Sequence, residues 1–205
     1  MTIGATGPLA VILAGGQSSR MGGGDKGLLP LGPGTVIGRV IDRIAPQVGS
    51  LAINANGDAD RFARFGLPVL PDPVLPDPVP DYPGPLAGIW AAMDWALAQG
   101  AEWVVTVPSD TPFVPGDLVA RLIRAAEDKA TVVIAATGDR IHPTCGLWSV
   151  RLRDDLAASL ARGERKVRDF TERHRAVVVT FDPGPPDPFF NINTPADLEL
   201  ARGWL

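Results

Sequence analysis

Short apolar runs alternate with helical patterns along most of this 205-residue chain. Residues 9–13 are apolar throughout and residues 103–107 nearly so, which is typical of strands buried on both faces of a sheet. Residues 36–44 instead repeat apolar side chains at helical spacing, directly after Thr35, a good helix cap. This alternation predicts an α/β fold: a Rossmann-like open, mostly parallel twisted sheet with helices on both faces.

The same patterns predict the remaining elements. Residues 71–85 hold seven prolines, so we expect neither helix nor central strand there. In the helix 86–98 we expect Leu86, Ile89, Met93 and Leu97 to face inward. A polar loop is expected between the strands 132–136 and 146–150. The other predicted strands are 51–54, 68–70 and 176–181, and the other predicted helices are 58–65, 115–127, 152–160, 167–174 and one that starts at Pro195 after Thr194.

Composition limits the function classes. The length suits a single domain over residues 1–205, and 45% hydrophobic content is ordinary for a globular protein. A net charge of −4 argues against a broad basic face for nucleic acid. No apolar run is long enough to span a membrane, and the first residues lack the features of a signal peptide. Because Cys145 is the single cysteine, an internal disulfide is excluded. We therefore expect a cytoplasmic monomer.

A glycine-rich segment follows the first predicted strand. Between Gly15 and Lys26 the chain holds five glycines and two cations, Arg20 and Lys26. Glycine backbones can form a concave anion site, and both cations suit phosphate. The spacing differs from a P-loop, since Gly27 follows Lys26, and from the dinucleotide fingerprint. The segment therefore predicts phosphate binding, with a surface turn as the simpler alternative.

Two polar residues follow predicted strands, where ligands bind in open α/β sheets. Asp110 comes after the strand 103–107 and is well placed to hold Mg²⁺, which prefers oxygen ligands and shares its shell with substrate phosphates. A turn role is the alternative. Asn54 ends the strand 51–54, and its amide could bind a ribose or a base edge, or could simply stabilise a turn.

Several motifs resemble one family. Leu-Ala-Gly-Gly at 13–16, Arg-Met-Gly at 20–22 and Asp-Lys at 25–26 are similar to the signature of nucleotidyltransferases. Among these, the chain resembles the MobA family of molybdenum cofactor guanylyltransferases. Cytidylyl-transferring relatives usually read Leu-Ala-Ala-Gly, so Gly15 and Gly16 favour guanylyl transfer. Asn-Ala-Asn at 54–56, the segment 81–88 and Asn-Ile-Asn-Thr-Pro at 191–195 extend the resemblance over residues 9–197.

The resemblance implies transfer of GMP from GTP to the terminal phosphate of the molybdenum cofactor, molybdopterin, with release of pyrophosphate. It implies Mg²⁺ bound at Asp110, and Arg20, Lys26 and Asp110 as catalytic residues. Backbone N–H groups from Leu13 to Gly16 are expected to cradle the nucleotide. Asp72 is a family nucleotide contact, although the long proline-rich segment leaves Asp77 as an alternative. The implied nucleotide-binding residues are Leu13, Ala14, Gly15, Gly16, Lys26, Asn54, Asp72, Gly84 and Asp110, with Gly88 allowing close backbone approach.

The implied residues on the pterin side are His142, Arg165, Lys166, Asn191 and Asn193. A polar loop, a solvated charge run and helix capping are the structural alternatives for them. GTP and molybdopterin are the implied partners, together with other cofactor-biosynthesis proteins and molybdoenzyme acceptors. The rival functions are cytidylyl transfer, nucleotidyl transfer to a sugar phosphate, and non-catalytic nucleotide or pterin binding on the same fold.

Overall fold

A seven-stranded sheet runs through the computed structural model, which describes residues 7–15, 25–73, 84–126 and 130–205. The strand order is β5-β4-β1-β6-β8-β7-β9. Neighbours pair in parallel except at β8, which runs antiparallel to both β6 and β7. The prediction of a mostly parallel sheet is confirmed. The strands are β1 (Leu9–Leu13), β4 (Ser50–Asn54), β5 (Val69–Leu70), β6 (Trp103–Pro108), β7 (Val132–Thr137), β8 (Arg140–Ser149) and β9 (Val177–Phe181).

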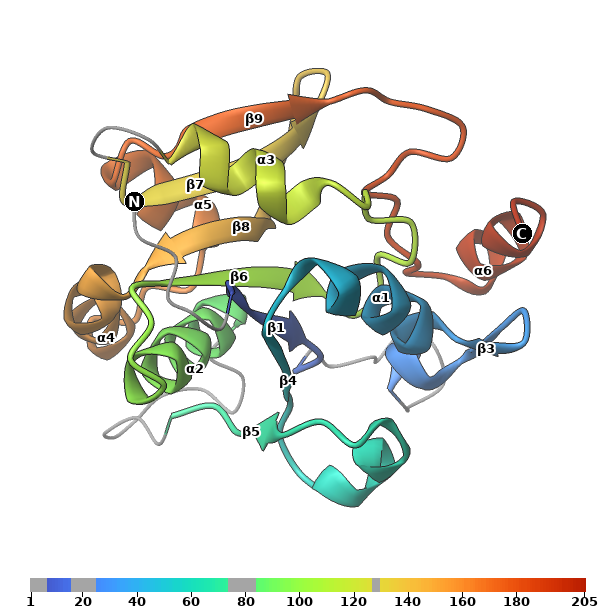
Figure 1. Ribbon diagram of the computed structural model, residues 1–205, viewed down its shortest axis with the longest axis horizontal. Helices are drawn as coiled ribbons and strands as arrows, with labels where there is room; N and C mark the ends of the chain where they lie inside the picture. The colour runs from blue at the N-terminus through green and yellow to red at the C-terminus, as the bar shows by residue number, and fades with distance from the viewer. Residues whose placement is uncertain (1–6, 16–24, 74–83, 127–129) are drawn as a thin grey trace.

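Helices cover both faces of this sheet, as predicted (Figure 1). The alternation along β1 shows how one strand serves two cores: Ala10 and Ile12 pack into one, Leu9 and Val11 into the other. On the first face lie α1 (Val36–Ile44), α3 (Leu118–Ala125) and the 3₁₀ helix η4 (Ala59–Phe65). On the second lie α2 (Pro85–Ala98), α4 (Arg153–Ala161) and α5 (Val167–Arg173).

A smaller apolar cluster lies beside the sheet. It joins a short hairpin of β2 (Pro30–Leu31) and β3 (Gly34–Thr35) to α6 (Pro195–Arg202). In Figure 1 the arrowhead of β6 points toward the side where α6 lies. The described residues also form the 3₁₀ turns η2 (Lys26–Leu28), η3 (Ala45–Gln47) and η5 (Val150–Leu152).

Local signals set several element ends as predicted. The Thr35 hydroxyl accepts the N–H of Gly38 at the start of α1, and Thr194 forms a capping box with Asp197 at the start of α6. Asp58 caps η4, which ends at Gly66 in the left-handed conformation. The predicted helix at 58–65 is present, but it is a 3₁₀ helix.

Three helix predictions need correction. The helix expected from residue 115 begins at Leu118, because Pro115 starts a turn whose carbonyl accepts the N–H of Leu118. Pro85 belongs to α2 after all, since the first helical position needs no N–H donor. Leu97 is half exposed rather than inward-facing; the small residues of α2, Ala92 and Ala96 among them, pack on the sheet instead.

The prediction of a polar loop between the strands 132–136 and 146–150 is wrong as well. Gly138 and Asp139 form a two-residue turn, so β7 and β8 are a hairpin and β8 already begins at Arg140. The register shifts between Ile134, which pairs with Gly146, and Ala135, which pairs with His142, so residues 143–145 of β8 form a bulge that contains Pro143. A bulge is where a strand tolerates proline.

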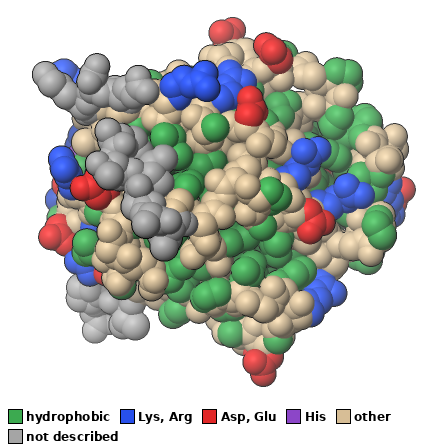
Figure 2. All heavy atoms as spheres, viewed as in Figure 1, with side chains coloured by type: hydrophobic (Ala, Val, Ile, Leu, Met, Phe, Trp, Pro, Cys, Tyr) green, Lys and Arg blue, Asp and Glu red, His purple; other side chains and the backbone are tan. Residues whose placement is uncertain are grey.

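The surface in Figure 2 carries basic and acidic side chains interspersed with hydrophobic and neutral ones on the face shown. None of the helices in the described part of the chain combines the length and the apolar character that crossing a membrane requires.

Candidate active site

A cavity of about 240 Å³ opens at the carboxyl ends of β1, β4 and β6. This is where the order of an open α/β sheet places ligands. It brings together residues from segments up to 178 positions apart in the chain. The lining residues are Leu13, Ala14, Gly15, Asp25, Lys26, Asn54, Asp72, Gly84, Pro85, Gly88, Pro108, Ser109, Asp110, Thr144 and Asn191.

Asp110 lies two residues after the end of β6 and is half-buried. Asn191 donates its amide Nδ2 to Asp110 Oδ1 at 2.9 Å, and the N–H of Ile192 donates to the Asp110 carbonyl at 2.9 Å. Burial raises the pKa of Asp110 above its usual value, while the Asn191 hydrogen bond and the charge of Lys26 act in the opposite direction. A partly desolvated carboxylate beside one lysine is thus a centre of negative charge that a cation would stabilise.

Lys26 is the first residue of η2. Its Nζ donates to Asn193 Oδ1 at 3.0 Å, so the ammonium group is oriented from the segment before α6. The Asp25 carboxylate caps the turn by accepting the N–H of Gly27 at 3.0 Å. Lys26 and Asp110, predicted from distant motifs, therefore lie at the same cavity.

Asn54 and Asp72 form a cluster with Asn56, whose role sequence reasoning missed. Asn54 Nδ2 donates to Asp72 Oδ1 at 2.9 Å and to the Leu70 carbonyl at 3.1 Å. Asn56 Nδ2 donates to Asp72 Oδ2 at 2.7 Å, and Asn56 Oδ1 accepts the Asp72 N–H at 2.9 Å. The two asparagines thus orient the carboxylate of Asp72. The signal in the sequence was the second asparagine of Asn-Ala-Asn, which lies two residues after Asn54 at the end of β4.

The N-terminus of α2 forms another wall. Gly84 has φ 76°, a conformation that favours glycine, and a Cβ there would lie 3.3 Å from the Arg165 carbonyl. A Cβ on Gly88 would lie 2.3 Å from Asn54 Oδ1, so Gly88 leaves room for that amide. Of the backbone N–H groups expected to cradle the nucleotide, that of Ala14 already donates to the Asn54 carbonyl at 2.8 Å. That part of the prediction needs correction.

A second cavity of about 160 Å³ adjoins the first and shares Pro108, Thr144 and Asn191 with it. His142 lines it, stacked on Phe189 and with Nε2 2.9 Å from the Thr137 hydroxyl. Burial, and then the charge of Arg140, lower the pKa of His142. The imidazole is therefore mainly neutral at neutral pH and offers hydrogen bonds rather than charge.

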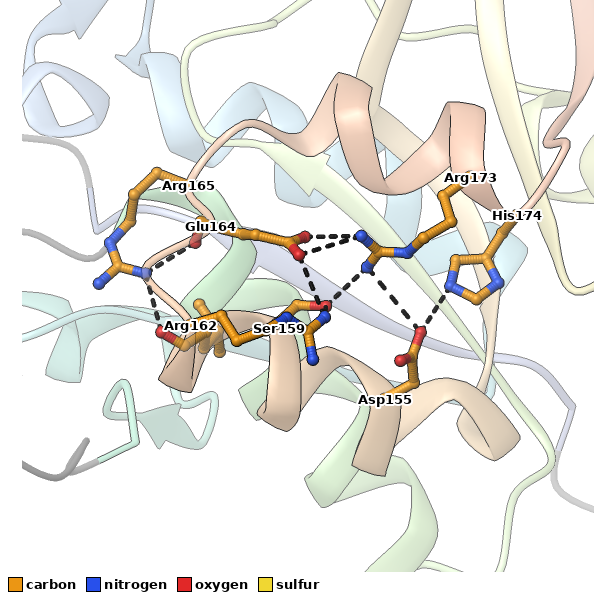
Figure 3. A network of polar contacts seen from close by, with 8 residues as sticks. Asp155, Ser159, Arg162, Glu164, Arg165, Arg173 and His174 are labelled. Atoms are coloured by element: carbon orange, nitrogen blue, oxygen red, sulfur yellow. Dashed lines mark hydrogen bonds and ion pairs between the residues drawn. The ribbon is translucent and has the colours of Figure 1, made fainter.

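Arg165 and Lys166 lie in the turn before α5, outside the described lining of both cavities. Arg165 Nη1 donates to the carbonyls of Leu160 and Glu164, at 3.1 and 2.7 Å. Glu164 is paired in turn with Arg173 of α5 and Arg162 (Figure 3). The turn abuts Gly84, and a pterin contact for either residue stays a prediction.

Three residues singled out from the sequence, Gly16, Arg20 and Asp77, lie outside the described residues. Within the described ranges, no three His, Cys, Asp or Glu side chains gather to share a metal ion. Asp110 nevertheless fits a hard divalent cation: it is a half-buried oxygen donor that lines the cavity, and substrate phosphates complete such shells.

Comparison with known proteins gives the family. A model of the MobA-like NTP transferase domain matches residues 10–177. The molybdenum cofactor guanylyltransferase of Rhodopseudomonas palustris (strain BisB5) is 50% identical over 197 residues, 94% of this chain and 91% of that one. Molybdopterin-guanine dinucleotide biosynthesis protein A of Archaeoglobus fulgidus superposes with a TM-score of 0.70 at 25% identity, covering 95% of this chain and 97% of its own.

The same fold occurs in a Mycobacterium tuberculosis protein solved in complex with manganese, with a TM-score of 0.67 at 20% identity, covering 98% of this chain and all of that one. With a family model and a half-identical relative both spanning most of its length, this chain belongs to the MobA-like NTP transferase family of nucleotidyltransferases.

Proposed function

We propose that this chain transfers GMP from GTP to the terminal phosphate of molybdopterin, releasing pyrophosphate and forming the guanine dinucleotide form of the cofactor. The observation that carries the proposal is the meeting of Lys26, Asp72 and Asp110 at one cavity. The half-identical relative carries the name of this activity.

The reaction depends on positioning the two phosphates and stabilising their negative charge rather than on a general base. The acceptor phosphate is already an oxyanion near neutral pH, so it can attack the α-phosphorus of GTP without losing a proton. The bond between the α-phosphorus and the bridging oxygen then breaks, and pyrophosphate leaves. Lys26 neutralises charge on the triphosphate and the leaving group, and we assign the same task to Arg20.

Asp110 would hold Mg²⁺, which when bound supplies positive charge between the reacting phosphates. Asn191 holds the carboxylate by its hydrogen bond and also lines the second cavity. It therefore lies where the two substrates would meet. Asp72, held by Asn54 and Asn56, remains the nucleotide contact we favour over Asp77.

The second cavity, with His142, is the place we propose for the acceptor molybdopterin. It adjoins the first through Asn191 and Thr144, so an acceptor phosphate there lies beside the GTP site. A neutral His142 beside the Thr137 hydroxyl suits the hydrogen-bonding edge of a pterin.

The test is pyrophosphate release with GTP, Mg²⁺ and molybdopterin. We expect turnover with GTP well above that with CTP, and Lys26→Ala should lower kcat by about 10²-fold or more. Its stability should change by no more than about 0.5 kcal/mol, because the lysine is not a core residue. Preference for CTP or a sugar phosphate would select the rival transferases. Nucleotide binding without pyrophosphate release would indicate a non-catalytic binder.

A further inference from the structure

One ion pair connects the turn that carries Lys26 to η4. Arg61, within η4, places Nε 3.4 Å from Asp25 Oδ2. The Asp25 side chain is 12% exposed, so the pair is largely shielded from water. The other carboxylate oxygen, Oδ1, accepts the N–H of Gly27. The Asp25 carboxylate thus links Arg61 to Gly27, and these two residues, Asp25 and Gly27, flank Lys26.

Arg61 is itself held by η4. Its guanidinium carbon lies 4.5 Å from the ring centroid of Phe62, which is fully buried in the core. Its Nη1 also donates to the carbonyl of Asp58, the residue that caps η4. These contacts fix the guanidinium to a rigid part of the fold, which favours a defined geometry over a loose surface pair.

The ion pair has a bearing on the cavity, because Asp25 is one of its lining residues. A carboxylate without a cationic partner would repel a triphosphate bound there, and a displaced Asp25 would no longer cap the Lys26 turn. Arg61 counters both effects: it compensates the charge of Asp25 and fixes the direction of the carboxylate.

We propose that Arg61 is a positioning residue for nucleotide binding, acting through Asp25 on the turn that carries Lys26. The inference rests on the proposed function, in which Lys26 binds the triphosphate. In this proposal Arg61 contacts neither substrate. It orients the Asp25 carboxylate, which caps the Lys26 turn, and compensates its negative charge.

Arg64 provides a matched control. It lies in the same 3₁₀ helix, and its guanidinium carbon stacks in the same way, 4.9 Å from the ring centroid of Phe65. Arg61→Ala should lower kcat/KM for GTP about tenfold, mostly through KM, since repulsion acts on bound GTP and transition state alike. Arg61→Lys should recover most of the loss, and Arg64→Ala should stay within about twofold of the wild type.

A double-mutant cycle isolates the route through Asp25. In Asp25→Asn the amide oxygen can still accept the Gly27 N–H, but the charge is gone. Arg61→Ala should therefore change KM by less than about twofold in that background. A tenfold effect that persists there, an Arg61→Ala variant that behaves like wild type, or an equal loss in Arg64→Ala would overturn the proposal.

Calorimetric GTP binding on the same variants separates this inference from the proposed function. Wild-type protein that binds GTP but releases no pyrophosphate would contradict the catalytic proposal. The Arg61 effect would then still be expected in the GTP dissociation constant. Thermal unfolding of each variant confirms that the compared proteins are folded. A folded Arg61→Ala protein that binds GTP as tightly as wild type would refute the positioning role.

Discussion

At the residue scale, the half-buried carboxylate of Asp110 is expected to favour cation binding while lowering the stability of the ligand-free protein. Its pKa is raised by burial, so ionisation is less favourable in the folded protein than in the unfolded chain. The contribution of Asp110 to the stability of the ligand-free protein is therefore greatest below the unfolded pKa of about 3.9, and it is lost as the pH rises through the raised pKa.

Asp110→Asn should consequently separate the two properties. Without GTP and metal we expect the variant to be at least as stable as wild type at pH 7, with the difference vanishing near pH 4. Mg²⁺-dependent turnover should fall by about 10²-fold or more, because the amide lacks the charge that a hard cation prefers. Urea unfolding at both pH values and Mg²⁺ titrations of turnover check this. Matching Mg²⁺ curves for the two proteins would reduce Asp110 to a turn residue.

Gly88 leads to a second prediction. The Asn54 amide is buried and bonded to both Leu70 and Asp72, so it cannot yield to a methyl group 2.3 Å away. Gly88→Ala should cost about 1–3 kcal/mol of stability and also weaken GTP binding, since Asp72 loses its support. Gly116→Ala, at a site where a Cβ meets nothing within 4 Å, is the control. Unchanged GTP affinity in folded Gly88→Ala protein would show that this cluster does not serve the nucleotide.

Sequence reasoning reached part of this residue-scale arrangement. Lys26, Asp72 and Asp110 sit in local motifs, and the structure brings them to one cavity. Arg61 sits in no such motif: it meets Asp25 from 36 positions away, and only the folded chain shows the pair. Which hydrogen bonds are already used, as at Ala14, depends equally on tertiary contacts.

At the scale of elements, charged side chains connect α4 to α5. Glu164 pairs with Arg173 of α5 at 2.8 Å, and Arg173 also donates to Ser159 of α4 at 2.6 Å (Figure 3). The hydrogen bond from Arg173 lowers the pKa of Glu164. The stabilisation is thus present above the ordinary pKa and is lost as the pH falls through the lowered value.

Glu164→Gln should therefore destabilise the protein at pH 7 by no more than about 1 kcal/mol, because the pair is partly exposed. The melting temperatures of variant and wild type should converge as the pH falls through the lowered pKa of Glu164, below which the carboxyl is protonated in both the folded and the unfolded chain. Calorimetry across this range measures the effect. A constant difference at all pH values would mean that the ion pair is not its cause.

Element prediction was most accurate where the pattern was local. The caps at Thr35 and Thr194 fixed helix starts because capping depends on neighbouring residues. The β7–β8 hairpin was missed because Pro143 argues against a strand, and β8 tolerates this proline because it lies in a bulge. The start of α3 was misplaced because Pro115 suits a turn as well as a first helical turn.

At the scale of the whole molecule, two cores share one sheet, since β1 supplies residues to both faces. We predict that residues 1–205 form one domain, and hence that the chain unfolds in a single cooperative transition. Saturating GTP with Mg²⁺ should raise the melting temperature. At a GTP concentration a hundred times the Kd, the free energy of unfolding should rise by about 2.7 kcal/mol. Scanning calorimetry with and without ligand is the measurement. Two separate transitions would contradict the single domain.

Because of how β8 pairs, substitutions at the tip of the β7–β8 hairpin affect the rest of the sheet less than substitutions near β6. Arg140, Ile141 and His142 pair with β7, whereas the pairing of β8 with β6 begins only at Gly146. Substitutions at the hairpin tip can therefore reshape the His142 cavity without shifting the register of β1, β4 and β6. Proteins with this fold can thus keep the residues at the ends of β1 and β4 unchanged while the β7–β8 hairpin changes the shape of the second cavity.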